Sequence, residues 1–381
     1  LTSEPVVIQN TPQIKDVFVM AEVLRELGVE VVFSGAELFL QAKEPLNYEA
    51  PYHLVKQMRA SIIVLGPLLA RLKQARVAMP GGCNIGLRKI DLHLKGLELL
   101  GAEVNAQEGF IEAQVKQLKG KTIKLDFPSV GATENLVMAA VLAEGTTVIE
   151  NAAQEPEIAD LANCLNLMGA KINGAGSNVI VINGVKRLGG VNYKVIPDRI
   201  EAGTYLLAGA VTQGDVKVTS VKPEHLYMVL KKLKETGCWL EVGTDSIRLQ
   251  VKDKLKAVNI STLPYPGFPT DLQAPFMALL TQAVGVSMLT ENIFENRFNF
   301  VSQLKKMQAQ VSLNSHHAFV SGPTKLKGAT VTAPDLRAGA ALVLAALAAA
   351  SESCIRDVHH ILRGYERLSE KLVALGANIS T

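Results

Sequence analysis

Apolar residues recur at helical spacing in front of a short sequence marker that repeats along the chain. One such run, with its apolar side chains on a single helix face, comprises Ile158, Leu161, Ala162, Leu165 and Met168. The marker is Leu-Gly-Ala or a close variant, and its central residues are numbers 28, 101, 169, 237, 308 and 376. Five of these six are Gly, which favours a left-handed C-cap at the end of each helix.

The segments around each marker repeat as well. Strand-like runs precede the helix and follow the marker, as in Val6–Ile8, Val29–Phe33, Thr147–Ile149 and Lys171–Asn173. A second helix in each unit is expected to begin near Arg59, Thr133, Glu201, Asp271 and Arg337. The pattern predicts an α/β chain in which one strand-helix-strand-helix unit of about 70 residues occurs six times. We expect two domains of three units, residues 1–196 and 197–381, because Ile196-Pro197-Asp198 interrupts the pattern.

The second-helix starts carry charged residues. Glu134, Glu201 and Asp271 are expected to cap free N–H groups there and to suit the helix dipole. Arg59 and Arg337 do not suit it, and an anion bound at those helix ends would remove the conflict.

Composition limits the classes of protein that remain. Hydrophobic residues make up 48% and charged residues 20% of the 381 residues, which excludes a disordered chain. A net charge of +3 argues against nucleic-acid binding. The longest apolar run, 338–350, is too short to span a bilayer, and no signal peptide is visible. The four cysteines form no CxxC or Cys/His cluster, so we expect no metal site and a reducing, cytoplasmic compartment. Cys164, Cys238 and Cys354 are interpreted as packing residues.

Four stretches carry candidate chemistry. The Gly-rich loop Pro80–Arg88 places Cys83 near Arg88, which lowers a thiol pKa; an exposed turn with an incidental cysteine is the alternative. Arginines that suit carboxylate or phosphate recur where loops meet elements, namely Arg59, Arg88, Arg297, Arg337 and Arg363. Three prolines stiffen the approach to Asp271, a candidate general base or an ordinary N-cap. The turn Ser129–Thr133 opens a helix and offers N–H groups to a phosphate, and His93 is a candidate to line the same pocket as the Cys83 loop.

Long motifs in one order now identify a family resemblance. They are Met58–Ser61, Pro80–Arg88, Ser129–Thr133, Glu150–Ile158, Pro197–Glu201, Phe268–Asp271, Phe294–Phe298, Asp335–Ala338 and Arg363–Arg367. Over nearly its whole length the chain resembles the UDP-N-acetylglucosamine enolpyruvyl (1-carboxyvinyl) transferases. The Cys83 loop separates these from the sister 3-phosphoshikimate enolpyruvyl transferases.

The resemblance implies an inside-out α/β barrel (alpha-beta prism) in each domain, with helices inside and the active site in the cleft between domains. It implies transfer of enolpyruvyl from phosphoenolpyruvate to the 3-hydroxyl of UDP-N-acetylglucosamine, without a cofactor or metal. This reaction is the first committed step of bacterial peptidoglycan synthesis, and so serves cell-wall biogenesis, cell shape and cell division. The expected partners are these two substrates, and fosfomycin as a covalent inhibitor at Cys83; no nucleic acid or membrane span is expected.

The resemblance also assigns roles to residues. Cys83 donates a proton and Asp271 accepts one; phosphoenolpyruvate is held by Arg88, Arg297, Arg337 and Arg363. The nucleotide sugar is held by Arg59, Arg88, Lys89, Ile90, Asp91, Leu92, Ser129, Val130, Gly131, Asp271 and Ile293. Supporting roles fall to Glu155, Asp198 and Asp335.

The chain departs from the family in three places. Lys89 stands where Pro is usual, Leu362 stands where Asp is usual, and no residue matches a Lys-Asn pair at the family's first helix. These departures leave open a non-catalytic paralogue that binds UDP-N-acetylglucosamine as a sensor or regulator, or a sister transferase with another acceptor. Six units need roughly 418 residues, about 37 more than the chain has, so we expect the first helix of domain one and the N-terminal strand of domain two to be missing. A polypeptide that starts at Leu1 is then expected to be poorly active and marginally stable.

Overall fold

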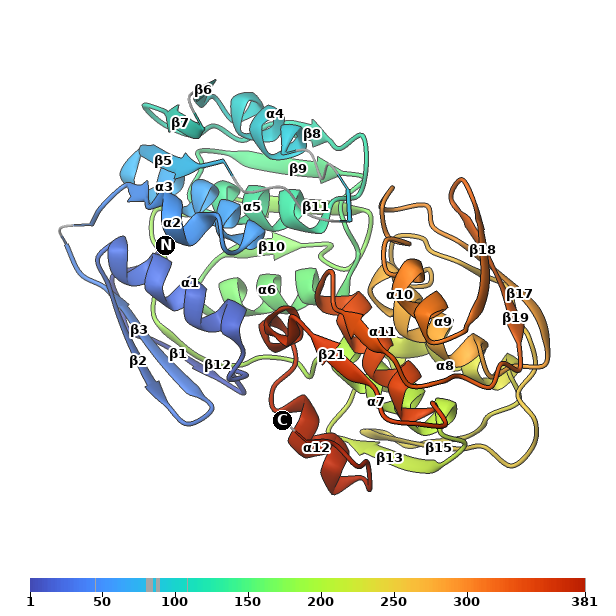
Figure 1. Cartoon of the computed structure of the whole chain (residues 1–381). Coiled ribbons are helices and arrows are strands. Elements are labelled where there is room, and N and C mark those ends of the chain that lie inside the picture. The colour runs from blue at the N-terminus through green and yellow to red at the C-terminus, as the bar shows by residue number, and fades with distance from the viewer. Residues whose placement is uncertain (45, 80–84, 87–89, 108, 381) are drawn as a thin grey trace. The chain divides into compact units, whose positions relative to one another are not determined.

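The chain divides into two compact units in the computed structural model, which describes residues 1–44, 46–79, 85–86, 90–107 and 109–380 (Figure 1). Unit 1 contains the described residues up to 79 and from 90 to Ile196. Unit 2 contains Pro197 onward, together with Ile85 and Gly86.

Unit 1 alternates short strands with helices. Its strands are β1 (Val6–Gln9), β2 (Val29–Ser34), β3 (Glu37–Ala42), β4 (Glu49–Ala50), β5 (Gln74–Ala78), β6 (Glu103–Gln107), β7 (Phe110–Gln114), β8 (Thr122–Lys124), β9 (Thr146–Glu150), β10 (Lys171–Asn173), β11 (Val179–Asn183) and β12 (Val191–Lys194). Its helices are α1 (Lys15–Glu26), α2 (Tyr52–Val55), the 3-10 helix η1 (Arg59–Val64), α3 (Leu65–Leu72), α4 (Asp91–Leu99), α5 (Val130–Ala140) and α6 (Pro156–Leu167).

Unit 2 repeats this alternation. Its strands are β13 (Asp215–Thr219), β14 (Trp239–Val242), β15 (Ser246–Gln250), β16 (Ile260–Ser261), β17 (Gly285–Thr290), β18 (Gln310–Asn314), β19 (His317–Gly322), β20 (Thr330–Thr332) and β21 (Cys354–Arg356). Its helices are α7 (Arg199–Val211), η2 (Pro223–Leu226), α8 (Tyr227–Glu235), η3 (Thr270–Leu272), α9 (Gln273–Leu280), α10 (Val301–Lys306), α11 (Leu336–Leu347), η4 (Val358–Arg363) and α12 (Leu368–Ala374).

The described strands form sheets that repeat one arrangement. In the orders β12-β1-β3-β2, β4-β5-β7-β6, β8-β9-β11-β10 and β16-β17-β19-β18, the first pair is parallel and the later pairs are antiparallel. The sheet β13-β15-β14 has the antiparallel part of this pattern and the pair β20-β21 has the parallel part. The six-fold repeat predicted from the sequence therefore corresponds to six sheets among the described residues.

The predicted helix ends are confirmed at the backbone. Each marker Gly has a positive φ, between 89° at Gly28 and 101° at Gly376. Gln308 occupies the equivalent place without being Gly and has a φ of 70°. The left-handed residue lets the chain leave the helix and begin the next strand, so the marker defines the helix-to-strand turn of every unit.

Helices fill the interior of unit 2, as an inside-out barrel requires. Along α7 and α9 nearly every residue is buried, and α11 buries its central residues. These three helices pack on one another, and the sheets of β13–β15 and β16–β19 lie outside them (Figure 1). In unit 1, α3 and α5 make the corresponding contact, at Gly66, where a Cβ would overlap the backbone oxygen of Asn135.

Two expectations about helix starts and cysteines are wrong. The groups that cap the second helices are Ser129, Asp198 and Asp335, whereas Glu134, Glu201 and Asp271 stand inside their helices and the Glu201 carboxylate meets Lys371 at 2.7 Å. Asx and Ser side chains reach these N–H groups because they stand just before the helix. Cys354 is exposed at the start of β21, so it is not a packing residue, whereas Cys238 is buried.

The apolar run 338–350 falls mostly in α11. Among the described residues, no helix combines the length and the apolar character that crossing a membrane requires.

Candidate functional site

Asp271 lies between two arginines in unit 2. Arg297 Nη2 donates to Asp271 Oδ1 at 2.8 Å, and Arg337 Nη2 donates to Asp271 Oδ2 at 3.2 Å. Arg297 also donates to the Thr270 carbonyl at 3.3 Å. The side chain of Arg297 is 3% exposed and that of Arg337 is 15% exposed, whereas the Asp271 side chain is 39% exposed. The carboxylate therefore faces outward while the two cations hold it from the interior.

The local structure explains why these groups converge. Asp271 stands in η3, after the run of prolines, and Arg337 is the second residue of α11. Asp335 caps α11 by accepting from the backbone N–H groups of Arg337 and Ala338, each at 3.0 Å. Asp335 and Asp271 thus supply negative charge beside the arginine at this helix end.

Neighbouring charges keep Arg337 protonated. Burial alone lowers the pKa of its guanidinium, but Asp271, Tyr365 and Asp198 outweigh burial and raise that pKa above its usual value. Tyr365 lies with its ring centroid 5.5 Å from the guanidinium carbon, and its hydroxyl is 2.9 Å from the Thr204 hydroxyl. Asp198, predicted as a supporting residue, caps α7 by accepting from Ile200 and Glu201 N–H groups at 2.7 and 3.1 Å.

Each of the two arginines has one buried N–H group without an acceptor among the described residues. Arg297 Nε and Arg337 Nη1 are buried and have no hydrogen-bond partner in the part of the chain that the structure describes. Leaving a buried N–H donor of a charged group without a hydrogen bond costs several times the free energy that an ion pair at the surface contributes. Both therefore point to an anionic acceptor that completes the arrangement.

Glu291 is a buried carboxylate that the sequence did not single out, and it orders the turn that contains Ile293 and Phe294. Glu291, 4% exposed, accepts from the hydroxyls of Thr262 and Thr270 at 2.9 and 3.1 Å. It also accepts from the N–H groups of Ile293 and Phe294 at 2.9 and 3.2 Å. It thus ties Ile293, a predicted nucleotide-sugar residue, to the residue preceding Asp271. No local pattern identifies this role, because its hydroxyl partners lie 21 to 29 residues away.

Arg363 lies at the end of η4, and this 3-10 helix packs against α11. Burial, His359 and Arg363 together lower the pKa of His360, while Asp335 and Asp357 oppose that change. Leu362, at the position where the family usually has Asp, is 51% exposed. Gly364, the residue after Arg363, lies against the side chain of Leu336 at the start of α11.

Predicted nucleotide-sugar residues of unit 1 gather at the start of α5. Arg59 begins η1, Ser129 is the N-cap of α5, and Val130 and Gly131 form its first turn. His93 on α4 lies against Gly131, and Arg59 is close enough to lower the pKa of this histidine. Ile90 is the N-cap residue of α4, and Asp91 and Leu92 are its first two residues. Glu155 stands before α6, where its side chain makes no capping hydrogen bond.

Three predicted residues, Cys83, Arg88 and Lys89, lie outside the residues that the structure describes. Within the same loop, Ile85 belongs to unit 2, where its carbonyl accepts from Asn296 N–H at 3.0 Å.

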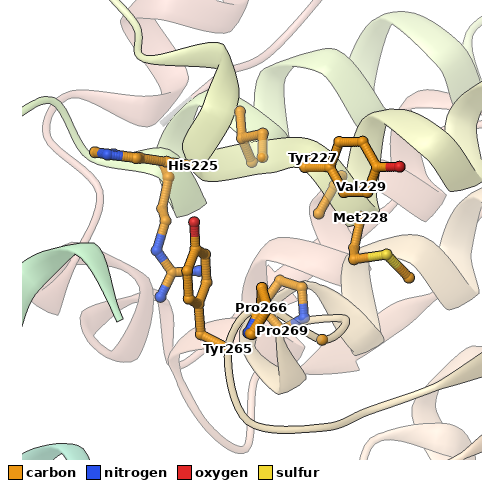
Figure 2. Close-up of a pocket in the computed structure, with 10 residues that line it drawn as sticks. His225, Tyr227, Met228, Val229, Tyr265, Pro266 and Pro269 are labelled. Atoms are coloured by element: carbon orange, nitrogen blue, oxygen red, sulfur yellow. The ribbon is translucent and has the colours of Figure 1, made fainter. Parts of the chain in front are cut away.

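A small pocket elsewhere in unit 2 contains none of the predicted site residues (Figure 2). One wall is the Pro-rich stretch before Asp271, and Tyr265 there stacks 5.7 Å from the guanidinium carbon of Arg199. The lining residues are Arg199, His225, Leu226, Tyr227, Met228, Val229, Tyr265, Pro266, Gly267 and Pro269. No group of three His, Cys, Asp or Glu side chains suited to a metal occurs among the described residues.

Comparisons with known proteins agree along the whole chain. Residues 1–372 match the model of the family described as EPSP synthase (3-phosphoshikimate 1-carboxyvinyltransferase). A protein of Carboxydothermus hydrogenoformans named UDP-N-acetylglucosamine 1-carboxyvinyltransferase 2 is 55% identical over 381 residues, which are 100% of this chain and 91% of the relative. A protein of Caldanaerobacter subterraneus subsp. tengcongensis named UDP-N-acetylglucosamine 1-carboxyvinyltransferase 1 is 51% identical over 379 residues, with 100% and 91% covered.

Solved structures give the same fold. The enolpyruvyl transferase NikO from Streptomyces tendae superposes with a TM-score of 0.90 at 27% identity, and 100% of this chain and 91% of that chain are covered. An EPSP synthase from Acinetobacter baumannii gives 0.75 at 18% identity, with 98% and 90% covered, a likeness of fold alone. The α/β fold class predicted from the sequence is thereby confirmed.

Proposed function

The chain belongs to the EPSP synthase (3-phosphoshikimate 1-carboxyvinyltransferase) family, and from this premise we propose that it is an enolpyruvyl transferase acting on UDP-N-acetylglucosamine. The reaction moves the enolpyruvyl group of phosphoenolpyruvate to the 3-hydroxyl of the sugar and releases phosphate. The identity of 51–55% with relatives named for this acceptor supports the choice of UDP-N-acetylglucosamine. In a bacterium this reaction serves peptidoglycan synthesis, and through it cell shape and division.

The observation that carries the proposal is the pair of arginines around Asp271, each with one buried N–H group. Arg297 Nε and Arg337 Nη1 need an acceptor, and a carboxylate presents two oxygens to such donors. Phosphoenolpyruvate carries a carboxylate and a phosphate. We assign the carboxylate to Arg297 and Arg337, and the phosphate to Arg363 together with Arg88, which lies outside the described residues.

The chemistry follows from the charge that develops during addition. The 3-hydroxyl oxygen forms a bond to the central carbon of phosphoenolpyruvate while the methylene carbon gains a proton, for which Cys83 is the proposed donor. Asp271 accepts the hydroxyl proton, since its carboxylate is partly exposed and oriented by Arg297 and Arg337. The tetrahedral adduct then returns a methyl proton to the Cys83 thiolate and loses phosphate, which takes a proton back from Asp271, while the surrounding cations stabilise the departing charge.

The nucleotide sugar has its proposed contacts in both units. In unit 1 they are Arg59, Ile90, Asp91, Leu92, Ser129, Val130 and Gly131, with Lys89 in the same segment. In unit 2 Ile293 contributes, held by Glu291. Glu155, Asp198 and Asp335 support the two groups of contacts, the last two by fixing the starts of α7 and α11.

Phosphate release tests the function. With phosphoenolpyruvate and UDP-N-acetylglucosamine together the protein should release phosphate, and omission of either substrate should abolish release. Fosfomycin should add its mass to the wild-type protein at Cys83 and stop turnover. The Cys83→Ala variant should lose both the mass increase and most turnover, and full activity with fosfomycin sensitivity intact in that variant would contradict the role of Cys83.

A further inference from the structure

His93 is a buried histidine whose outer ring edge faces the first turn of α5. Its side chain is 6% exposed. A Cβ placed on Gly131 would lie 3.4 Å from the ring Cε1 and 3.5 Å from Nε2, so these two atoms adjoin the Gly131 backbone. Among the residues that the structure describes, the His93 ring forms its hydrogen bond through Nδ1 and none through Nε2. A polar ring atom thus faces the helix start.

The other ring nitrogen of His93, Nδ1, forms a hydrogen bond with Asn135, whose side-chain orientation is fixed by backbone groups. The Gly66 N–H donates at 2.6 Å to one terminal atom of Asn135, which must therefore be the acceptor Oδ1. The other terminal atom is then Nδ2, and it donates to the Ile62 carbonyl at 3.3 Å. Its second hydrogen points to His93 Nδ1 at 3.0 Å. The Asn135 amide is wholly buried, so it has no alternative partner in water.

This chain of donors determines the tautomer of His93. Because Asn135 Nδ2 can only donate, His93 Nδ1 must accept and carries no proton. Burial, assisted by the positive Arg59 and opposed by Asp91, lowers the pKa of His93 to about 4, so the ring is neutral at physiological pH. The single ring proton is then on Nε2, the atom beside Gly131.

Further donors lie at the same helix start. The backbone N–H groups of Val130 and Gly131 form no hydrogen bond within the described part of the chain, as is usual in a first helical turn. They carry the positive end of the α5 dipole, and the Arg59 guanidinium is near. Two backbone donors, an imidazole N–H and a cation together match an anionic oxygen, above all one of a phosphate.

We propose that Asn135 fixes His93 as the Nε2–H tautomer, so that His93 donates a hydrogen bond to a phosphate oxygen of the nucleotide sugar at the N-terminus of α5. The proposal rests on the proposed function, which supplies the nucleotide sugar. His93 is then a binding residue that touches the ligand, and Asn135 is a positioning residue that acts through it.

Binding measurements with paired variants test the contact. His93→Gln can place an amide N–H where Nε2 stands, whereas His93→Asn is too short to do so. By calorimetry, His93→Asn should raise the Kd for UDP-N-acetylglucosamine about tenfold or more, and His93→Gln should stay within about threefold of wild type. The same loss should appear with UDP. His53→Asn, at an exposed position on α2, serves as the control and should leave both affinities unchanged.

Any other result of these binding measurements contradicts one named part of the proposal. Equal affinities in His93→Asn and wild type would exclude the hydrogen bond. A loss with UDP-N-acetylglucosamine but not with UDP would place the contact on the sugar and exclude the phosphate. A wild-type protein that binds neither compound would contradict the proposed function as well as this inference.

The tautomer has a direct readout that a packing role would not change. In protein with ¹⁵N-labelled histidine, His93 should show an unprotonated Nδ1 and a protonated Nε2 at neutral pH, assigned by the signal lost in His93→Gln. Asn135→Asp replaces the donor by an acceptor, so Nδ1 should become protonated in that variant. An Nδ1 protonated in the wild type, or unprotonated in a folded Asn135→Asp variant, would refute the positioning role.

Discussion

At the scale of single residues, the left-handed position after each marker helix is a requirement of backbone geometry. Gly169 has a φ of 100° and nothing lies within 4 Å of a Cβ placed on it. Gly169→Ala therefore tests the backbone cost alone, and we expect a loss of about 1–2 kcal/mol in the free energy of unfolding by urea denaturation. Gln308→Gly, at the equivalent position with a φ of 70°, should cause no loss. Equal stability of Gly169→Ala and wild type would show that this turn does not need the left-handed conformation.

Glu134 couples stability to pH. Burial, then the charges of Glu157 and Glu155, raise its pKa from 4.5 to about 7 in the folded chain. The folded state thus holds this proton more tightly than the unfolded state, so the stability it contributes is full below pH 4.5 and is lost as the pH rises through 7. Glu134→Gln should be more stable than wild type at pH 8, by up to about 3 kcal/mol, and nearly equal at pH 5. Glu144→Gln, an exposed carboxylate, controls for the loss of one charge.

Arg297 should be more sensitive to replacement than an exposed arginine in a similar pair. A lysine cannot reproduce its planar fork, so Arg297→Lys should lower kcat/KM for phosphoenolpyruvate by about 10- to 100-fold. Arg248→Lys, whose arginine forms an exposed pair with Asp215 at 2.7 Å, is the matched control. Steady-state kinetics and a thermal melt of both variants separate activity from stability. An unchanged kcat/KM in Arg297→Lys would remove this arginine from substrate binding.

The residues that the sequence could and could not identify differ in the range of their contacts. Asp271, Arg297 and Arg337 stand in distinctive local motifs, so the sequence identified them, and the structure brings them together across 26 and 66 residues. Glu291 and Asn135 have no such motif. Their roles arise only from tertiary contacts. One example is the hydrogen bond between Asn135 and His93, which are 42 residues apart in the sequence.

At the scale of elements, the periodicity predicted roughly where the second helices begin but not which residues cap them. The expected starts at Arg59, Glu201 and Arg337 are within two residues of the helices that form, and the start expected at Thr133 is three residues after that of α5. The capping groups Ser129, Asp198 and Asp335 stand just before α5, α7 and α11. Apolar spacing locates a helix face, but it does not determine the residue at which the first turn begins.

The contact between α3 and α5 depends on one glycine. A Cβ on Gly66 would overlap the backbone and side-chain oxygens of Asn135, so the two helices cannot keep their approach with a larger residue. Gly66→Ala should cost about 1–3 kcal/mol of unfolding free energy in urea. At Gly189, the nearest atom to a Cβ lies at an ordinary 3.6 Å, so Gly189→Ala is the control and should be nearly neutral. If the two variants were equally stable, helix packing at Gly66 would be looser than the structure indicates.

At the scale of the whole chain, the repeat could be predicted but the pairing of its ends could not. Periodicity shows that similar units follow one another. It does not show that β12, the last strand of unit 1, pairs in parallel with β1, so that Val191 lies beside Val6. Nor does it show that one repeat of about 70 residues in unit 2 forms the three-stranded sheet β13-β15-β14, while another repeat of unit 2 contributes only the pair β20-β21. Long-range strand order depends on how the helices pack inside, which a local pattern does not contain.

Ligand-linked stability distinguishes the three functions that the sequence left open. A ligand that binds only the folded protein stabilises it by about 2.7 kcal/mol at a free concentration one hundred times its Kd. UDP-N-acetylglucosamine should therefore raise the melting temperature of the wild type, and 3-phosphoshikimate should not. The same stabilisation without phosphate release would favour a sensor or regulator, because binding would persist without turnover. Stabilisation by 3-phosphoshikimate instead would favour the sister acceptor and contradict the proposed substrate, while leaving enolpyruvyl transfer and the arginine pair around Asp271 in place.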